Sequence, residues 1–392
     1  MKQFGVLIAG LLCSANIFAV SLEETAKTIL IQSPQYALEN YTLKATGAAL
    51  KTDSNLPDPE LGGEYLVMPS DVDNRWTLEL SWGVEWPGVY KARANEAKSK
   101  LSAAEIQVIT QRAERLAEIK DLLLDYIRCE QKLDLLEELT QNNDTIYRLA
   151  EEAARGGELT ILDLNKVRLE YANIRVAKAT LLDEKAEVVS SISEIYGKDP
   201  TSILENMDCI FPEAVIPSEA EIELIKKNAP AVKVAMAEAE SAKLNKKVAR
   251  MEALPAISLG YKHAFEDAMH FNGATFGVSI PIFSSRGKQK AADANIAEAE
   301  FKAESTSQEI ESQAMAAVKR LALINQQIKE IAPIIENADY NSALLKAYKG
   351  GVITLIEYIS DRNYFTNAAI ELVSLRHNAA KSLAFLQRYL YP

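Results

Sequence analysis

The sequence predicts a mainly α-helical protein with a small β part, and it predicts that this plan occurs twice along the chain. Three observations support the prediction. Several short motifs recur at an offset of 194 to 196 residues, some stretches alternate between apolar and polar residues, and others keep a helical apolar period for about 60 residues. Alternation is typical of strands, and a sustained helical period is typical of coiled coils.

The repeat is visible in five pairs of motifs that occur in the same order in both halves of the chain. Each half is expected to contain a helix, two strands, a long helix, a Gly-Gly break and a final helix. We therefore expect a first repeat over residues 20–217 and a second over residues 218–392, which together form one domain. Four motifs pair within this offset, namely Ser33-Pro34 with Ala229-Pro230, Gly83-Val84 with Gly277-Val278, Arg155-Gly156-Gly157 with Lys349-Gly350-Gly351, and residues 159–163 with 353–357; in the fifth pair, Leu56-Pro57 falls near Leu254-Pro255.

The second strand of each repeat shows the clearest alternation. Residues 77–86 place apolar side chains on one face and polar or small ones on the other, and residues 274–282 repeat the pattern. An apolar face of this kind suits lipid, although a soluble β-sandwich uses the same alternation. We expect the first of these rows to face lipid, and it consists of Leu78, Leu80, Trp82, Val84 and Trp86.

The longest helix of the first repeat is expected over residues 89–155, which contain neither proline nor glycine. At 1.5 Å per residue this helix would reach about 100 Å, much more than an ordinary domain spans. Shorter helices over residues 22–49 and 158–197 together match that length, so long antiparallel coiled coils are expected. The second repeat gives the corresponding helices over residues 218–252, 287–349 and 352–389.

The first nineteen residues have the features of a cleaved secretory signal. Lys2 supplies a positive charge, residues 6–12 are apolar, and Ala19 ends the segment with a small side chain. Lipidation of Cys13 is the alternative, but Leu12 is bulky where a lipid-attachment motif needs a small residue. We therefore expect residues 1–19 to be a signal peptide.

The charge and hydropathy of the remaining chain exclude several partners. Removal of Lys2 leaves 42 basic residues against 55 acidic ones, a net charge of −13, which argues against nucleic acid. No run of 18 or more apolar residues follows the signal, so any membrane contact is expected through strands. Cys129 and Cys209 do not imply a disulfide framework.

Four strands of this length can cross a bilayer, but they cannot close into a barrel by themselves. The two open edges would leave unpaired backbone groups in the hydrocarbon, each at a cost of several kcal/mol. Two copies of the chain would supply eight strands, whose lumen side chains usually fill, whereas three copies supply twelve strands and a water-filled passage. The sequence therefore favours a homotrimer with a 12-stranded β-barrel.

The chain resembles the TolC-type outer-membrane efflux factors, through the duplicated plan, the Pro-ended strands that lead into long helices, and the glycine-containing hairpin ends. The family pattern Tyr-x-x-Gly-x-x-Thr-x-x-acid is matched by Tyr348, Gly351, Thr354 and Glu357. The resemblance covers nearly the whole chain after the signal. It implies four transmembrane strands per chain in a trimeric outer-membrane barrel. It also implies a periplasmic α-barrel of helices whose lower end opens when an adaptor and an inner-membrane pump bind.

The resemblance also assigns roles to the two hairpin ends. It implies that Asp163, Tyr348, Glu357 and Ser360 lie at the pore or gate, and that the ends contact the adaptor. The chain departs from the family pattern at Ile353, where an arginine is common, and at Ser360, where a second acid is common. The residues expected to contact the adaptor are Gly156, Gly157, Leu159, Thr160, Gly350, Gly351, Ile353 and Thr354.

The expected function is the exit duct of a tripartite efflux complex for small molecules or metal ions, in the outer membrane with most of the chain in the periplasm. An exit duct for secreted proteins and a soluble periplasmic coiled-coil scaffold remain as alternatives. No catalytic motif is present, so neither an enzyme nor a cofactor is expected. His263 and His270 are expected in a loop with Glu266 and Asp267, where their spacing fits no standard zinc pattern, so no metal site is expected.

Overall fold

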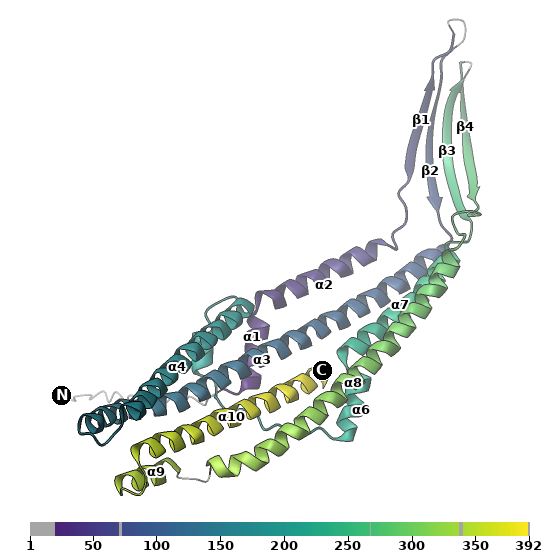
Figure 1. The fold of residues 1–392 in the computed structure, drawn as a ribbon. Coiled ribbons are helices and arrows are strands. Elements are labelled where there is room, and N and C mark those ends of the chain that lie inside the picture. The colour runs from purple at the N-terminus through teal and green to yellow at the C-terminus, as the bar shows by residue number, and fades with distance from the viewer. Residues whose placement is uncertain (1–19, 70–72, 267, 337–339, 391–392) are drawn as a thin grey trace, which may run out of the picture. The chain divides into compact units, whose positions relative to one another are not determined.

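The computed structural model describes residues 20–69, 73–266, 268–336 and 340–390. The expected signal peptide and Cys13 lie outside these residues. Helices and strands follow the same order in both halves of the chain (Figure 1). The first half contains α1 (Leu22–Gln32), α2 (Pro34–Thr52), β1 (Glu60–Leu66), β2 (Arg75–Val84), α3 (Pro87–Arg155), α4 (Ile161–Tyr196) and the short α5 (Thr201–Glu205). The second contains α6 (Glu219–Asn228), α7 (Pro230–Met251), β3 (Ala256–Glu266), β4 (Met269–Ser279), α8 (Lys288–Glu336), α9 (Tyr340–Lys349) and α10 (Leu355–Gln387), with the 3₁₀ turn η1 (Arg388–Leu390). The predicted mainly α fold with a small β part is confirmed.

The two opening helices are each divided, whereas the sequence predicted one continuous helix in each repeat. Both breaks come directly before a proline. Ser33 (ψ 143°) and Ala229 (ψ 128°) leave the helical region, because the ring of the following proline disfavours that region for the residue before it. Pro230 then begins α7, where its fixed φ suits the first turn. The prediction of continuous helices over residues 22–49 and 218–252 was therefore wrong.

The predicted helix over residues 287–349 appears as α8 and α9. Residues 337–339, which separate the two, lie outside the described residues. Pro333 lies inside α8, three residues before its last residue. The helix predicted over residues 89–155 is one uninterrupted element, α3.

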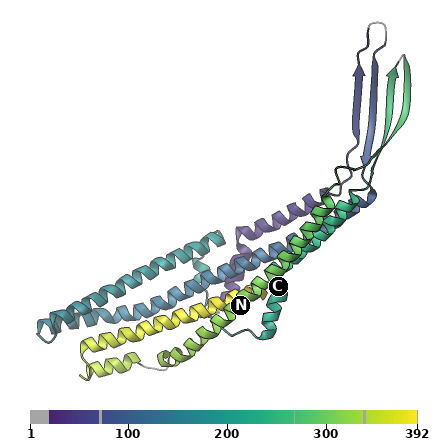
Figure 2. The ribbon, with the colours of Figure 1, turned by 45° about the vertical axis from the view of Figure 1, so that its right-hand side comes forward.

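The four strands form one antiparallel sheet in the order β1-β2-β3-β4 (Figures 1 and 2). The register pairs Trp82 with Leu259, and Leu259 with Phe276, so apolar residues lie side by side across three strands. His263 and His270 lie within β3 and β4. Their predicted position in a loop was wrong, because the two strands extend almost to their connection.

The chain divides into two compact units, and each takes residues from both repeats. The first unit comprises the described parts of Met1–Ser33, Glu118–Glu213 and Gln327–Ala380. In this unit α4, the second part of α3, and α10 run alongside one another (Figure 2). One apolar cluster joins α3 to α4 and is formed by Cys129, Leu133, Leu136, Leu139, Ile174 and Leu181. A second cluster, which we call the tip cluster, lies under the hairpin ends and is formed by Ile146, Ala150, Leu164, Val167, Leu344, Leu355, Tyr358 and Ile359.

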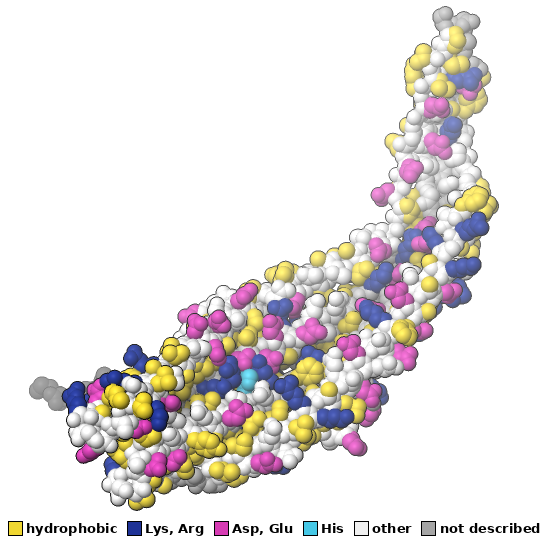
Figure 3. Space-filling view, viewed as in Figure 1, with side chains coloured by type: hydrophobic (Ala, Val, Ile, Leu, Met, Phe, Trp, Pro, Cys, Tyr) yellow, Lys and Arg dark blue, Asp and Glu magenta, His cyan; other side chains and the backbone are white. Residues whose placement is uncertain are grey.

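The second unit comprises Pro34–Ala117, Ala214–Gln326 and the described part of Lys381–Pro392. It contains the sheet, α2, the first part of α3, α6, α7 and most of α8. Basic and acidic side chains alternate over the visible face of its helices (Figure 3). Among the described helices of the whole chain, none has the length and apolar character that a membrane-spanning helix requires.

Candidate functional site

The two Gly-Gly breaks end their helices in the same way. Gly157 (φ 80°) and Gly351 (φ 70°) adopt the left-handed conformation, which costs glycine nothing because it has no Cβ. In each break the backbone N–H groups of the left-handed glycine and of the following residue bond back to carbonyls of the last helical turn, which is a Schellman motif. The bonds run from Gly157 to Ala154 (3.2 Å), Glu158 to Ala153 (2.9 Å), Gly351 to Tyr348 (3.0 Å) and Val352 to Ala347 (2.9 Å).

A threonine begins the next helix at both ends. Thr160 Oγ1 accepts the N–H of Asp163 at 3.1 Å and donates its hydroxyl to the Asp163 carboxylate at 2.7 Å. Thr354 Oγ1 likewise accepts the N–H of Glu357 at 3.2 Å, and the Thr354 N–H donates to Glu357 Oε2 at 2.8 Å. The second arrangement is a capping box. Both predicted gate carboxylates are therefore also helix-capping residues, which the sequence-based interpretation missed.

These hydrogen bonds also favour the charged carboxylates. The hydroxyl of Thr160, followed by the ammonium of Lys166 at 3.1 Å, lowers the pKa of Asp163. The backbone N–H and then the hydroxyl of Thr354 lower the pKa of Glu357. Both carboxylates are therefore negatively charged at neutral pH.

Exposure at the hairpin ends differs in part from the prediction. Thr160 and Thr354 are exposed, but Leu159 and Ile353 are half-buried and pack against the tip cluster. The more exposed apolar side chains are Ile161 (64%), Leu162 (71%) and Val352 (78%). Leu164 and Val167 lie on the face of α4 that packs into the tip cluster, whereas Ile161 and Leu162 lie on the exposed face of the helix.

Tyr348 does not project freely from the second hairpin. Its ring stacks on Tyr358 at 5.3 Å, and it lines a cavity of about 580 Å³ between α3, α9 and α10. Arg362 also lines this cavity with only 4% of its surface exposed, and its guanidinium lies 5.7 Å from the Tyr358 ring. Burial lowers the pKa of Arg362, although nearby Tyr358 and Glu138 act in the opposite direction. No pattern in the sequence predicts an arginine in the interior at this position.

The predicted lipid-facing row lies on one face of β2. Leu78 (47%), Leu80 (50%) and Trp82 (41%) are exposed in the single chain, and Val84 is half-buried. Trp86 is exposed but lies beyond β2, which ends at Val84. The row continues on the neighbouring strands through Leu259 (58%), Tyr261 (54%) and Phe276 (70%).

The opposite face of the sheet is polar. Glu79 pairs with Lys262 across β2 and β3 and accepts a hydrogen bond from Thr275 at 2.9 Å. Gly260 lies between Ser81 and Thr275 in the register, and its hydrogen leaves room for Thr275, since a Cβ there would lie 2.5 Å from Oγ1. A sheet with one apolar and one polar face suits a wall between lipid and water.

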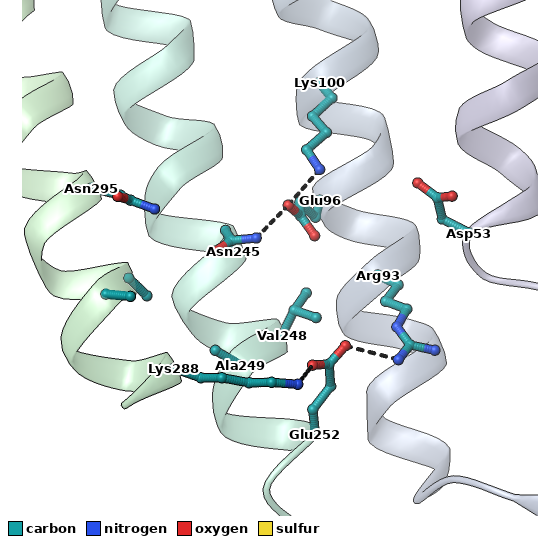
Figure 4. A pocket seen from close by; sticks show the side chains of 12 residues that line it. Asp53, Arg93, Glu96, Lys100, Asn245, Val248, Ala249, Glu252, Lys288 and Asn295 are labelled. Carbon is teal, nitrogen blue, oxygen red and sulfur yellow. Dashed lines mark hydrogen bonds and ion pairs between the residues drawn. The ribbon is translucent and has the colours of Figure 1, made fainter. Parts of the chain in front are cut away.

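An ion-pair cluster connects three of the junctions between the sheet and the helices (Figure 4). Arg93, in the first turns of α3, donates to Glu85 just after β2 (3.0 Å) and to Glu252 at the end of α7 (2.8 Å). Glu252 also accepts from Lys288, the first residue of α8, at 3.0 Å. Burial alone would raise the pKa of Glu252, but the hydrogen bonds from Arg93 and Lys288 outweigh it, and the net pKa is lowered.

The same cluster lines a cavity of about 500 Å³ (Figure 4). On the wall of this cavity, the Glu96 carboxylate accepts hydrogen bonds from Lys100 (2.8 Å) and Asn245 (2.9 Å), and only 6% of the surface of Glu96 is exposed. Three acidic and three basic side chains line the cavity, so it offers a ligand no surplus charge of either sign. In the part of the chain that the structure describes, no group of three or more His, Cys, Asp or Glu side chains is placed to hold a metal ion.

Comparison with solved structures identifies proteins of the same architecture, although no family model matches the sequence and no curated protein matches it. The Campylobacter jejuni CmeC outer membrane channel superposes with a TM-score of 0.77 at 18% identity, over 94% of this chain and 85% of that chain. The outer membrane protein VceC from Vibrio cholerae gives 0.75 at 16% identity, over 94% and 95% of the two chains. The Neisseria gonorrhoeae MtrE outer membrane channel gives 0.76 at 13% identity, over 94% and 88%. The chain therefore has the fold of the TolC-type outer-membrane channels that its sequence resembles.

Proposed function

We propose that this chain is the outer-membrane exit duct of a tripartite efflux complex, which exports small molecules or metal ions. The observation that carries the proposal is the sheet, whose exposed apolar face and polar opposite face occur in a fold shared with outer-membrane channels over 94% of the chain. The test is electrical. The purified protein should produce stepwise conductance in a planar lipid bilayer, and a preparation that is folded but never conducts would refute the proposal.

The duct is a trimer in this proposal. The sheet has open edges at β1 and β4, and four strands are too few to close. Three copies would close twelve strands around a passage, with the row at Leu80 and Trp82 towards lipid and the Glu79 face towards water. Native mass spectrometry of detergent-extracted outer membrane should give three chains per particle, and a folded monomer would contradict this.

The partners in this proposal are a periplasmic adaptor and an inner-membrane pump. The exposed side chains of Leu162 and Val352 next to the capping threonines give the hairpin ends an apolar surface that a helical hairpin of the adaptor can cover. Photo-crosslinking amino acids at Leu162 and Val352 should capture the adaptor in cells. The same amino acid at Ile210, which is 66% exposed on the segment after α5, serves as the control and should not.

Glu357 and Ser360 would line the lower end of the passage. Both are exposed on the early turns of α10, and Glu357 is held as a carboxylate by Thr354. Repeated three times around an axis, Glu357 would form an acidic ring that favours cations. The adaptor and the gate are separate parts of the proposal, because Thr354 holds Glu357 within a single chain, with or without a bound adaptor.

A duct for secreted proteins has the same architecture as a duct for small molecules or metal ions. Neighbouring genes would distinguish the two, because they would encode a protein exporter in the first case and a drug or metal pump in the second.

A soluble periplasmic scaffold would need the sheet's apolar face to be covered by protein. Fractionation separates that alternative, since a scaffold would leave the outer membrane with a high-salt wash and an integral duct would not.

A further inference from the structure

Two of the three histidines of the chain lie side by side near the end of the β3–β4 hairpin. His263 pairs with Asn272 across the hairpin, and His270 pairs with Phe265. Their ring centroids are 5.3 Å apart and their planes are nearly parallel, at 16°. The closest atoms are His263 Nε2 and His270 Nδ1, at 3.3 Å. Both side chains stand on the apolar face of the sheet, which is the face of Leu259 and Tyr261.

Neighbouring side chains fix which nitrogen of His263 is available. The carbonyl oxygen of Asn272 lies 2.6 Å from His263 Nδ1 and also accepts the hydroxyl of Tyr261 at 2.7 Å. A carbonyl oxygen can only accept, so Nδ1 must carry the proton. The lone pair of His263 is therefore on Nε2, the atom that faces His270. An outer partner that orients a histidine in this way is a regular part of protein metal sites.

The spacing of the two nitrogens suits a shared metal ion. Two imidazole nitrogens that bind one tetrahedral Zn²⁺ at about 2.05 Å lie about 3.4 Å apart. The observed separation is 3.3 Å. Trp76 and Phe265, whose rings lie 5.2 Å from His263 and 5.1 Å from His270 respectively, pack against the two imidazoles.

We propose that His263 Nε2 and His270 Nδ1 bind one divalent transition-metal ion, with Zn²⁺ as the expected occupant and Asn272 as the residue that positions His263. Without metal, His270 donates its Nδ1–H to His263 Nε2. When the ion enters, that proton leaves Nδ1 and a proton from water binds His270 Nε2, so the neutral pair releases no net proton. Glu266 is not among the ligands, because it is engaged by Arg75 at 2.6 Å on the opposite face of the strand.

The site connects adjacent strands of one hairpin, so the ion would act as a cross-link beside the β3–β4 connection. It lies within one chain and depends neither on the trimer nor on the proposed duct. Other candidate ligands are poorly suited to compete. Burial raises the pKa of the thiols of Cys129 and Cys209, which keeps them protonated, and His377 is hydrogen-bonded to Asp125 at 2.7 Å.

The test is metal binding by the full-length protein in detergent, purified without a histidine tag. Calorimetry with Zn²⁺ should give one ion per chain, and the electron paramagnetic resonance spectrum with Cu²⁺ should show coupling to two imidazole nitrogens. His263→Ala and His270→Ala should each weaken Zn²⁺ binding more than tenfold. Asn272→Leu keeps both histidines and should weaken binding by about tenfold or more, as loss of an outer partner does.

Lys262→Ala is the matched control, since this neighbouring residue points to the opposite face of β3, and it should bind Zn²⁺ like the parent protein. Circular dichroism of each variant checks that the sheet and helices remain folded. A parent protein that binds no Zn²⁺ would overturn the proposal. So would a double variant, His263→Ala with His270→Ala, that folds and binds Zn²⁺ as tightly as the parent, because the ion would then lie elsewhere.

Discussion

At the scale of single residues, the carboxylates that the sequence pointed to have a structural role as well as a proposed functional one. Asp163 and Glu357 complete the first turns of α4 and α10 through Thr160 and Thr354. A substitution that removes the carboxylate therefore disturbs the helix start and the proposed gate together. Amide substitutions separate the two roles, because asparagine and glutamine keep an oxygen that accepts the same hydrogen bonds but carry no charge.

Arg93 is the residue on which the junctions of the second unit depend most. Arg93→Met should lower the stability of this unit by about 2 kcal/mol, because it leaves the partly buried Glu85 and Glu252 without their shared donor. The measurement is the midpoint of thermal unfolding by circular dichroism in detergent. Lys288→Met is the control, since Lys288 is more exposed and binds only one of the two carboxylates, and its effect should be clearly smaller. Equal midpoints for Arg93→Met and the parent protein would contradict the role of this cluster.

Acid should weaken the same cluster. In the folded protein the pKa of Glu252 lies below the ordinary pKa of a glutamate. The ion pairs of Glu252 therefore contribute fully to stability when the pH is above the ordinary pKa, and this contribution is lost as the pH falls through the lowered pKa. The difference in midpoint between the parent and Arg93→Met should therefore shrink below about pH 4, where unfolded glutamates become protonated.

At the scale of elements, the two hairpin ends repeat one design, a Schellman motif followed by a threonine cap. Gly157→Ala should destabilise the first end by about 1 kcal/mol, because its φ of 80° is unfavourable for a residue with a Cβ. Hydrogen exchange of the amides at the start of α4 should become faster. Gly156→Ala is the matched control, since a Cβ there meets only ordinary contacts of 3.6 Å and φ is not positive. If both variants exchange alike, the left-handed turn does not limit opening of this end.

The strands allow an equally direct comparison. Trp82→Asp and Ser81→Asp place the same charge on adjacent residues of β2, which point to opposite faces of the sheet. Trp82→Asp should block assembly in the outer membrane, because it places a carboxylate in lipid, whereas Ser81→Asp should assemble on the polar side. The measurement is the amount of heat-resistant oligomer in outer-membrane extracts. Equal amounts for the two variants would show that the assigned facing of β2 is wrong.

At the scale of the whole molecule, the sequence predicted the architecture better than it predicted the sites. The repeat, the strands and the long helix α3 follow from local patterns, namely paired motifs, period-two alternation and a stretch without glycine or proline. The ion-pair cluster does not, because Glu252 lies 159 residues from Arg93 in the sequence and the charged residues of the cluster show no pattern of their own. The pairing of His263 with His270 was missed for a related reason. It depends on the register of β3 and β4 and on how close these strands extend to their connection.

The gate of the proposed duct can be tested at Asp163 and Tyr348. Asp163→Asn with Tyr348→Phe should leave the oligomer intact and raise single-channel conductance in a planar bilayer. If these groups pair across neighbouring hairpins only in the closed state, each lost contact removes about 1 kcal/mol from that state, and three equivalent contacts shift the population by about 100-fold. Asparagine keeps the start of α4, and loss of the Tyr348 hydroxyl leaves its stacking on Tyr358 in place.

Glu357→Gln tests the pore lining separately. It keeps the capping box and the shape of the passage but removes one charge per chain, so cation preference should fall while the resting conductance changes little. Reversal potentials under a salt gradient measure the preference. If the double variant conducts like the parent protein, Asp163 and Tyr348 do not hold the closed state. If Glu357→Gln keeps the parent's selectivity, the acidic ring is not at this level of the passage, and the exposed Asp361 one turn further along α10 becomes the next residue to test.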